Sequence, residues 1–467
     1  MTLDPLLLSR LQFAWVIAWH ILLPAFTVGL ASYIALLEGL HFFTKQEIYF
    51  RIAGFWTRIF AVSFAMGVVS GIIMPFQFGT NWSRYADATA NVLSPLLAYE
   101  GMMAFFLEAT FLGVLLFGRG RVPRWMHLFA AMMVALGTLF SSFWILAANS
   151  WMQTPAGFAV VRGRFFPTDW AAIVFNPSAP YRLAHTVVGF YVTSGLVVLG
   201  VAAFLIRRRT HAAEGKAMLS TTLWLLLGLV PLQMVLGDMH GLNTRRYQPI
   251  KLAAIEARWT TMARAPLTLF AIPDETHQTN RAAIDVPLLG SLLLTHGPNG
   301  VVEGLEAAPR ADRPPVAIVF FAFRIMVGAG VLMLVVVLWG NLLRRRGRVY
   351  ESRLFLTACQ FAAPLGFIAV IAGWTTTEVG RQPWTVYGLL RTAQSVSPSL
   401  TGPDVAATLA GYVLAYIVMF PAGILVMARI VRRGPVSQDA DSPVQAGLPG
   451  EPILALGGRR GEAEGGS

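Results

Sequence analysis

Only one cysteine, Cys359, occurs among the 467 residues, and it lies in an apolar stretch. A single cysteine excludes an internal disulfide, an iron–sulfur cluster held by cysteines, and the cysteine motif that attaches a c-type haem. Charged residues are also scarce, at 13% of the chain, about half the share found in soluble domains. With 55% hydrophobic residues, the composition indicates an all-α integral membrane protein with several transmembrane helices.

Acidic residues are fewer than basic ones, 24 against 36, which leaves a formal charge of +12. Such an excess can indicate nucleic-acid binding, but in a membrane protein the distribution of basic residues between loops carries more information. Nine apolar stretches are long enough to cross a bilayer, which takes about 20 residues. The expected spans are residues 12–38, 54–78, 95–118, 126–150, 183–206, 218–238, 316–342, 354–378 and 405–430.

Basic residues gather in alternate loops of this nine-span arrangement and again after the ninth span. By the positive-inside rule, the loops that hold them lie in the cytoplasm. An odd number of spans puts the two termini on opposite sides, so we expect the N-terminus outside and the C-terminus in the cytoplasm. Because topology accounts for the basic runs, no nucleic-acid partner is expected.

The longest connection, residues 239–315, follows the sixth span and is expected outside. A loop of this length is usually functional or disordered. Its segment from Lys251 to Arg258 is amphipathic enough for a short helix, whereas the part after Asn299 is typical of a linker. The chain therefore divides into membrane helices at 1–238 and 316–434, the outer loop between them, and a Gly- and Pro-rich tail at 435–467 that we expect to be disordered.

One apolar span, residues 95–118, carries two carboxylates, Glu100 and Glu108. An acid at membrane depth costs at least about 2.5 kcal/mol and is read by default as functional. A spacing of eight residues places the two roughly 80° apart around a regular helix and about 12 Å apart along it. The pair therefore suits a proton relay. The alternative is that each carboxylate hydrogen-bonds a neighbouring helix and only holds it in place.

Two of the eight histidines, His20 and His185, lie within expected spans near the outer face. A lone histidine inside a membrane is more often a hydrogen-bonded packing residue than a ligand, so both readings stay open. The remaining six are expected to be interface or surface residues, either in loops or at cytoplasmic span ends: His211, His240, His277, His296, His41 and His127.

Met326 lies about ten residues into the seventh span, and Arg324 precedes it within the same apolar run. An arginine inside a membrane needs a carboxylate partner, and a haem propionate is one such group. Glu378 ends the eighth span, with Trp374 one turn before it and Arg381 just after it. A methionine in an apolar span is normally core filler, and it is the neighbouring arginine that makes Met326 a candidate for cofactor binding.

Five of the candidates map to the outer half of the bilayer: His20, Glu100, His185, Met326 and Glu378. Packing residues scattered along the helices would not be expected to share one depth. Histidine, methionine and carboxylate side chains can all bind haem iron, and Met/His pairs occur in electron-transfer haems. The pattern therefore predicts several haems near one face of the membrane.

Eight stretches, from the first span to the eighth, match one known family: SRLQFAWVIAWH (9–20), MPFQFGTNWS (74–83), PLLAYEGMMAFFLEATFLG (95–113), WILAANSWMQ (144–153), VLGD with KLAAIEA (235–238, 251–257), FAFRIM (321–326) and GWTTTEVGRQPW (373–384). On these motifs the sequence closely resembles the larger, haem-bearing subunit of cytochrome bd quinol oxidases. That family has nine spans and an outside N-terminus.

The resemblance implies that His185 and Met326 are the axial ligands of a low-spin haem b, which Arg324 supports. It also implies that His20 and Glu378 bind the irons of a high-spin pair, with either assignment open. The pair would be a haem b with a haem d, or with a third haem b. Two further residues would complete the cofactor site: Trp374, lying between haems, and Arg381.

The resemblance further implies that Lys251 and Glu256 belong to the quinol site, that Glu100 lies at the high-spin pair, and that Glu108 lies on the proton route to it. Ubiquinol or menaquinol would be oxidised at the outer face, and dioxygen would be reduced to water with cytoplasmic protons, without a pump. The expected partners are a second membrane subunit and a small single-helix subunit, in the bacterial inner membrane. The interval between Glu256 and FAFRIM is short, which resembles the short-loop group with its cyanide-insensitive members.

The alternative function from a different class is a proton-coupled transporter that carries no haem and uses Glu100 and Glu108 as its relay. That reading leaves Met326, Arg324 and His20 unexplained. A haem–copper oxidase would need a cluster of deep histidines, and only His20 and His185 lie deep in expected spans.

Overall fold

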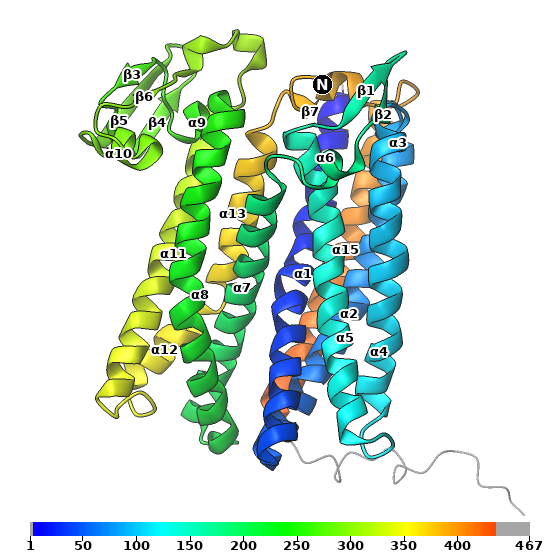
Figure 1. Ribbon diagram of the computed structural model, residues 1–467, viewed down its shortest axis with the longest axis vertical. Coiled ribbons are helices and arrows are strands. Elements are labelled where there is room, and N and C mark those ends of the chain that lie inside the picture. Colours follow the sequence, from blue (N-terminus) through cyan, green and yellow to red (C-terminus); the bar gives the residue numbers. More distant parts are fainter. Residues whose placement is uncertain (1–2, 436–467) are drawn as a thin grey trace, which may run out of the picture.

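Nine long helices run side by side in the part of the chain that the computed structural model describes, residues 3–435 (Figure 1). Each is long and apolar enough to cross a membrane, which confirms the expected number and order of spans. All but the first residue of the expected disordered tail, 435–467, lie outside the described residues. The spans are α1 (Pro5–Thr44), α2 (Glu47–Thr80), α3 with α4 (Ser83–Tyr99 and Phe105–Phe117), α5 (Arg124–Gln153), α7 (Ala179–Arg208), α8 (Ala212–Tyr247), α11 (Val316–Arg345), α12 with α13 (Arg353–Ala362 and Leu365–Val379) and α15 (Gly402–Arg433).

Two of these spans change their helical geometry midway. In the third span a π-helical turn, Glu100–Ala104, joins α3 to α4, and the amide of Phe105 donates to the carbonyl of Glu100. In the eighth span Pro364 separates α12 from α13, because proline has no amide hydrogen to continue a helix. π turns are rare and occur often at functional sites.

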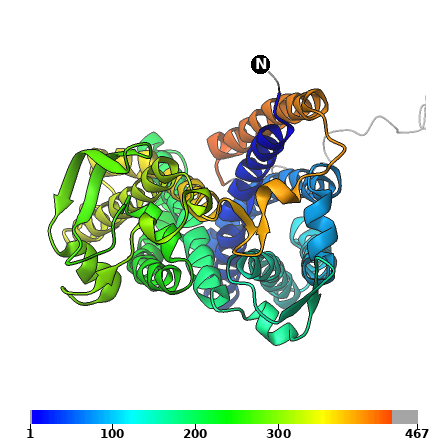
Figure 2. The same cartoon turned by 90° about the horizontal axis from the view of Figure 1, so that it is seen from above.

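The spans form two groups on either side of α1 (Figures 1 and 2). One group contains α2 to α5 and α15, and the other contains α7, α8 and α11 to α13. Helix α1 packs against members of both, including α2, α5, α7 and α15. Its contact with α7 is close: Ser194 Oγ donates to the Phe26 carbonyl at 2.6 Å, and a Cβ at Gly29 would lie only 2.5 Å from that Oγ. Helix α1 thus joins the two groups.

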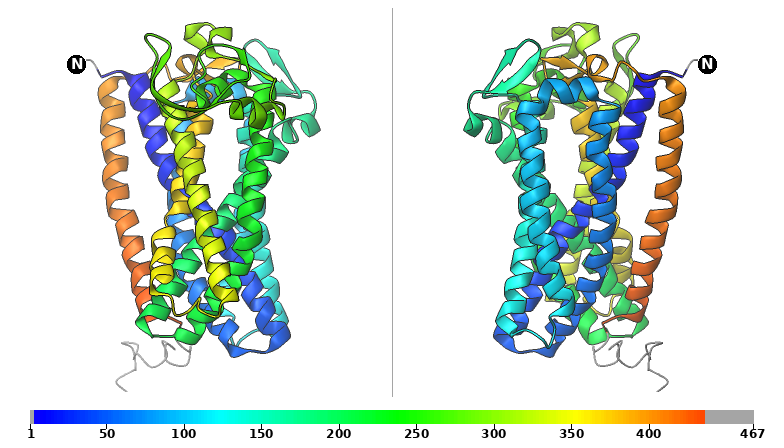
Figure 3. Two further views of the ribbon diagram at one scale, coloured as in Figure 1. Left: turned by 90° about the vertical axis from the view of Figure 1, so that its left-hand side faces the viewer. Right: turned by 90° about the vertical axis from the view of Figure 1, so that its right-hand side faces the viewer.

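The longer connections and their short strands lie at one end, with the start of α1; we call this the loop end (Figures 1 and 3). Its antiparallel pairs are β1 (Phe158–Val161) with β2 (Arg164–Pro167), β3 (Met262–Ala263) with β6 (Val301–Val302), β4 (Leu267–Asp274) with β5 (Thr279–Val286), and β7 (Trp384–Val386) with β8 (Leu390–Arg391). The opposite end holds the short connections 45–46, 118–123, 209–211 and 346–352, which carry the basic runs; we call it the basic end.

The loop between the sixth and seventh spans is ordered and differs in two ways from expectation. It starts later, because α8 continues to Tyr247. The segment after Asn299, expected as a linker, instead supplies β6, which pairs with β3. The expected short helix is present as α9 (Pro249–Ile255). Other short helices are α10 (Leu289–Thr295), η2 (Leu305–Ala307) and η3 (Arg310–Asp312) in this loop, α6 (Trp170–Val174) after β2, and α14 (Thr392–Ser395) after β8.

This loop packs onto the membrane helices through its own apolar cluster. Leu252, Ala271 and Leu305 from the loop are buried together with Val319 and Phe320 of α11. Burial of such side chains stabilises the contact by about 25 cal/mol for each square ångström removed from water. The loop is therefore a fixed cap over α11.

Candidate functional site

Glu378, at the end of α13, is held by donors from two elements at the loop end. Asn149 and Gln153 of α5 donate to its Oε1 at 3.0 and 3.2 Å, and Arg381 donates to its Oε2. Asn149 and Gln153 are four residues apart and therefore lie on the same face of α5. Arg182 of α7 in turn donates to Asn149 Oδ1 at 3.4 Å. The candidate iron ligand Glu378 is thus the centre of a buried polar network, which we call the loop-end network.

Lys251 of α9 belongs to the same network. Its Nζ donates to the side-chain oxygen of Gln153 at 2.5 Å and to that of Gln248 at 2.7 Å. Burial, followed by the nearby Arg182 charge, holds the pKa of Lys251 well below its usual range. Gln153 therefore touches both Lys251, a candidate for the quinol site, and Glu378, a candidate for the haem site. The motif WILAANSWMQ contains Asn149 and Gln153, but their role becomes visible only in the fold.

Glu256, the other candidate for the quinol site, forms an ion pair with Arg324 of α11 at 2.9 Å. Arg324 also donates to the backbone carbonyls of Ile255 and Thr268, and its guanidinium lies 4.1 Å above the Phe320 ring. From the sequence, Arg324 was expected to have a carboxylate partner, and a haem propionate was one such group. In the structure that partner is Glu256.

Two candidate iron ligands each face a glycine on the neighbouring helix. A Cβ at Gly71 of α2 would lie 3.2 Å from the His20 ring, and one at Gly373 of α13 would lie 2.8 Å from the Met326 sulfur. The His20 Nδ1 also lies 2.9 Å from Ser70 Oγ. Both side chains are half-buried, and any larger residue at the two glycines would displace them.

His185 of α7 lies against one face of α8. A Cβ at Gly237 would lie 3.3 Å from its ring, the side-chain amide of Gln233 is 3.3 Å from both ring nitrogens, and the ring of His240 is centred 5.7 Å away. These three residues of α8 are spaced to share one helix face. His240 was expected in a loop, and that expectation was wrong because α8 is longer than its apolar run.

The two carboxylates of the third span both meet α5. Ser141 Oγ donates to Glu100 Oε1 at 2.8 Å. Glu108 is buried, with 8% of its surface exposed, and its side chain passes over Gly137. The bridge from Ser141 fits the packing reading of Glu100 as well as the relay reading. Trp374, on α13 next to Gly373, is half-buried.

A second buried ionic cluster lies at the basic end, and it was not expected from the sequence. Arg119 donates to Glu38 Oε1 at 2.9 Å and to the Phe50 carbonyl at 3.1 Å. His127 Nδ1 lies 3.2 Å from Glu38 Oε2, close enough for an ionic contact but off the line of a hydrogen bond. His127 lies near the start of α5, at a span end as expected, but it was also expected to be an interface or surface residue and is instead buried, with 5% of its surface exposed. The sequence feature that could have indicated this cluster is Glu38, an acidic residue at the end of an apolar span.

Several buried guanidinium nitrogens in the loop-end network have no partner among residues 3–435: Nε and one Nη of Arg381, and Nε of Arg182. A buried donor without a partner costs about 1–3 kcal/mol, and a carboxylate group is its strongest partner. Across the same described residues no three His, Cys, Asp or Glu side chains cluster as metal ligands. A haem iron needs only axial protein ligands, so this arrangement suits haem and its propionates.

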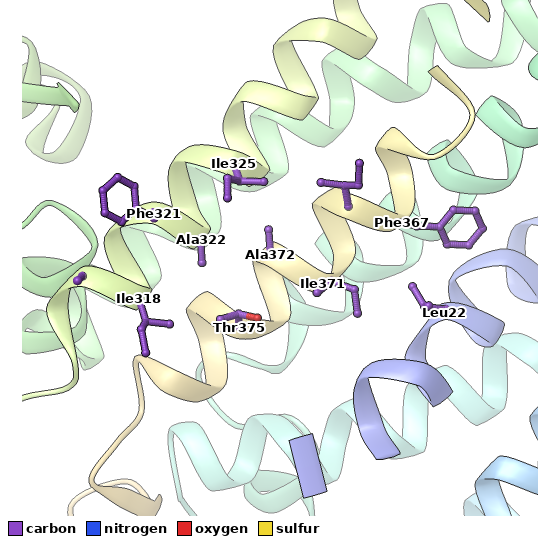
Figure 4. Close-up of a pocket in the computed structure, with 11 residues that line it drawn as sticks. Leu22, Ile318, Phe321, Ala322, Ile325, Phe367, Ile371, Ala372 and Thr375 are labelled. Carbon is purple, nitrogen blue, oxygen red and sulfur yellow. The ribbon is translucent and has the colours of Figure 1, made fainter. Parts of the chain in front are cut away.

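An apolar cavity of about 720 Å³ opens between α11 and α13, near Leu22 of α1 (Figure 4). Its lining contains no charged side chain, so it can hold an apolar chain but contributes no ligand or proton carrier. It is lined by Leu22, Ala317, Ile318, Phe321, Ala322, Ile325, Phe367, Ile368, Ile371, Ala372 and Thr375.

Comparison with known proteins gives a consistent result. The family model described as cytochrome bd terminal oxidase subunit I matches residues 8–435. The chain is 36% identical to cytochrome bd ubiquinol oxidase subunit 1 of Bacillus subtilis, covering 92% of this chain and 94% of that protein. It is 32% identical to cytochrome bd-II ubiquinol oxidase subunit 1 of Escherichia coli, covering 95% and 99%. The solved structure of bd oxidase from Geobacillus thermodenitrificans superposes with a TM-score of 0.85 at 32% identity, covering 92% and 99%.

Proposed function

Because this chain belongs to the cytochrome bd terminal oxidase subunit I family, we propose that its loop-end network connects the site of quinol oxidation to the site of dioxygen reduction. The chain is a subunit of a quinol:O2 oxidoreductase, a respiratory terminal oxidase of the bacterial inner membrane, and it works in a complex with a second subunit. The observation that carries the proposal is the continuous hydrogen bonding from Lys251 through Gln153 to Glu378.

The residues around this network fit haem. His185 and Met326 would hold a low-spin haem b, and His20 and Glu378 would hold the high-spin pair, a haem b with a haem d or a third haem b. When bound, these haems supply electron transfer from quinol and the site where dioxygen is reduced. The glycines facing His20, His185 and Met326 are consistent with this assignment because each lets the ligand side chain lie directly against the neighbouring helix.

Three arginines and one tryptophan would surround the haems. Arg381 and Arg182 have free guanidinium nitrogens that suit propionate carboxylates. Arg324 would act on the cofactor less directly, because its guanidinium is committed to Glu256 and two backbone carbonyls. Trp374 would pack between haems, beside the glycine that faces Met326.

The quinol ring would bind between Lys251 and Glu256, at the edge of α9. A neutral amine has two N–H donors and one lone pair. Gln153 and Gln248 accept hydrogen bonds from Lys251, so when the amine is uncharged its lone pair would accept a hydroxyl proton from quinol. Arg324 would hold Glu256 in place, through their ion pair, as the second polar contact. The ring could be that of ubiquinol or menaquinol.

Two quinols release four electrons and four protons at the loop end, and reduction of one dioxygen to two waters consumes four protons. We place the loop end outside and the basic end in the cytoplasm, following the positive-inside rule. Protons from the cytoplasm would then travel along the third span past Glu108 and Glu100 toward the loop end. Charge separates across the membrane without a pump. A small single-helix subunit would complete the complex.

Quinol-driven oxygen consumption by the purified complex tests the proposal. Lys251→Met should lose most of this rate, because no amine remains to accept the quinol proton. Lys216→Met, which removes an exposed lysine at the basic end, is the matched control and should keep it. A Lys251→Met complex that oxidises quinol at the normal rate would overturn the assignment of the quinol site.

A further inference from the structure

The π turn in the third span changes how its two carboxylates are oriented. In a regular helix Glu100 and Glu108 would point about 80° apart. The turn Glu100–Ala104 instead closes with the amide of Phe105 on the carbonyl of Glu100, five residues back. A π turn absorbs one extra residue, so the eight-residue interval covers about two full turns. The two side chains then point within roughly 20° of each other.

The helix that receives both carboxylates is α5, which packs against α4 and the π turn. Ser141 and Gly137 are four residues apart and therefore share one face of α5. Ser141 Oγ donates to Glu100 at 2.8 Å. At Gly137 there is no side chain, and the space is taken by Glu108. One turn of α5 thus meets both carboxylates.

The contact at Gly137 is with the carboxylate side chain itself. A Cβ at this position would lie 2.6 Å from Glu108 Cγ, 3.2 Å from the Glu108 amide nitrogen and 3.4 Å from the carbonyl of Ala104, the last residue of the π turn. Cγ is fixed by a single side-chain torsion, so it can give way only by changing rotamer. A methyl group at residue 137 would therefore rotate Glu108 or push α4 away from α5.

We propose that the extra residue of the π turn and the missing side chain at Gly137 together position Glu108 for proton transfer to Glu100. Helical side chains lean toward the N-terminus of their helix, so Glu108 leans toward Glu100. The proton leaves the carboxyl of Glu108 and arrives at the carboxylate of Glu100 through hydrogen-bonding groups between the two, with the Ser141 hydroxyl at the Glu100 end, and no electron moves in this step. Gly137 is a positioning residue. The inference rests on the proposed proton route through these two carboxylates.

Small residues at helix contacts commonly serve close packing alone, and that reading makes a different prediction. Under that reading, a methyl group at residue 137 would impair assembly of the complex and leave Glu108 unaffected. A Cβ added at Gly113 of α4 or at Gly101 of the π turn would meet no atom within 4 Å. Gly113→Ala is therefore a matched control that adds the same methyl group to the same pair of helices without touching Glu108.

The test uses the full complex carrying Gly137→Ala, Gly113→Ala or Glu108→Gln. Oxygen consumption is measured beside the haem spectrum and the infrared carbonyl band of protonated Glu108, which is identified by its disappearance in Glu108→Gln. We expect Gly137→Ala to keep the haem spectrum, shift the carbonyl band and slow oxygen reduction roughly tenfold to a hundredfold, as misplacement by about 1 Å does elsewhere. Gly113→Ala should change none of these.

The three variants distinguish failure of the proton route from failure of the positioning role. Normal turnover in Glu108→Gln would remove the proton route on which the inference rests. Slow turnover in Glu108→Gln, combined with normal turnover and an unmoved band in Gly137→Ala, would overturn the positioning role alone.

If Gly137→Ala does not assemble, deletion of Met102 tests the register instead. Met102 is an exposed residue of the π turn, and its removal converts that turn to a regular one. The deletion should slow oxygen reduction by a similar factor. Normal turnover in the deletion variant would contradict the proposal.

Discussion

The guanidinium of Arg324 lies 2.9 Å from the carboxylate of Glu256, and this ion pair joins the start of α11 to the end of α9. Glu256 is 3% exposed and Arg324 17% exposed. Removing one partner of a buried ion pair costs about 3–5 kcal/mol, because the other charge is left uncompensated. The pair therefore sets the position of α9, which also carries Lys251, relative to the membrane helices.

Glu256→Gln should lower quinol oxidation, because the amide keeps the shape but removes the charge that Arg324 and the quinol hydroxyl meet. Artificial donors that reduce the haems directly should still support oxygen reduction. Both rates are measured with an oxygen electrode. Glu303→Gln, an exposed change in the same loop, is the control. An equal loss with both kinds of donor would indicate that Glu256 is structural.

Met326→Leu should leave the protein folded, because the two side chains have similar volume. It should remove the low-spin haem spectrum or lower its midpoint potential, since a thioether ligand favours reduced iron. Met333→Leu, a buried change two turns further along α11, should have no such effect. A low-spin haem with unchanged spectrum and potential in Met326→Leu would rule out this ligand.

Lys251 should impose an acid limb on the pH profile of quinol oxidation. Its pKa is lowered by burial and by Arg182, so at a given pH more of the amine is uncharged and able to accept a proton than in an ordinary lysine. As pH falls through that lowered pKa, the amine becomes charged and kcat/KM for quinol should fall. Lys251→Met should lose this limb in its residual activity. Retention of the same limb would assign it to another group.

Glu108→Gln should keep all haems and quinol binding but slow oxygen reduction severely, because an amide cannot carry a proton. Glu100→Gln should do more and perturb the high-spin haems as well, since Glu100 is nearer the loop end. A packing role for Glu108 predicts that the amide is tolerated. Steady-state oxygen consumption recorded with the haem spectrum decides between the two roles.

The membrane spans could be predicted from the sequence because an apolar run of about 20 residues has few other uses. The ends of the helices could not. Helix α8 continues to Tyr247 through the polar residues Asp238, His240 and Arg245, where hydropathy is low but packing against α7 and the loop persists. The segment after Asn299 likewise has low hydropathy and was expected as a linker. It nevertheless supplies β6, which pairs with β3.

The candidate site residues could be named one by one from the sequence, but the contacts between them could not. Gln153 and Asn149 carry ordinary polar side chains, and nothing in their spacing indicates that they bind Glu378. The partner of Arg324 was also beyond sequence reasoning, because Glu256 is distant along the chain. The π turn has no clear sequence signal, so the angle between Glu100 and Glu108 could only be given for a regular helix.

The most direct test of the central claim is a pyridine haemochrome spectrum of the purified complex, quantified against the amount of this subunit. We predict three haems for each copy, with haem b bands and either a haem d band or a third equivalent of haem b. A complex that contains no haem would contradict this assignment and favour the proton-coupled transporter.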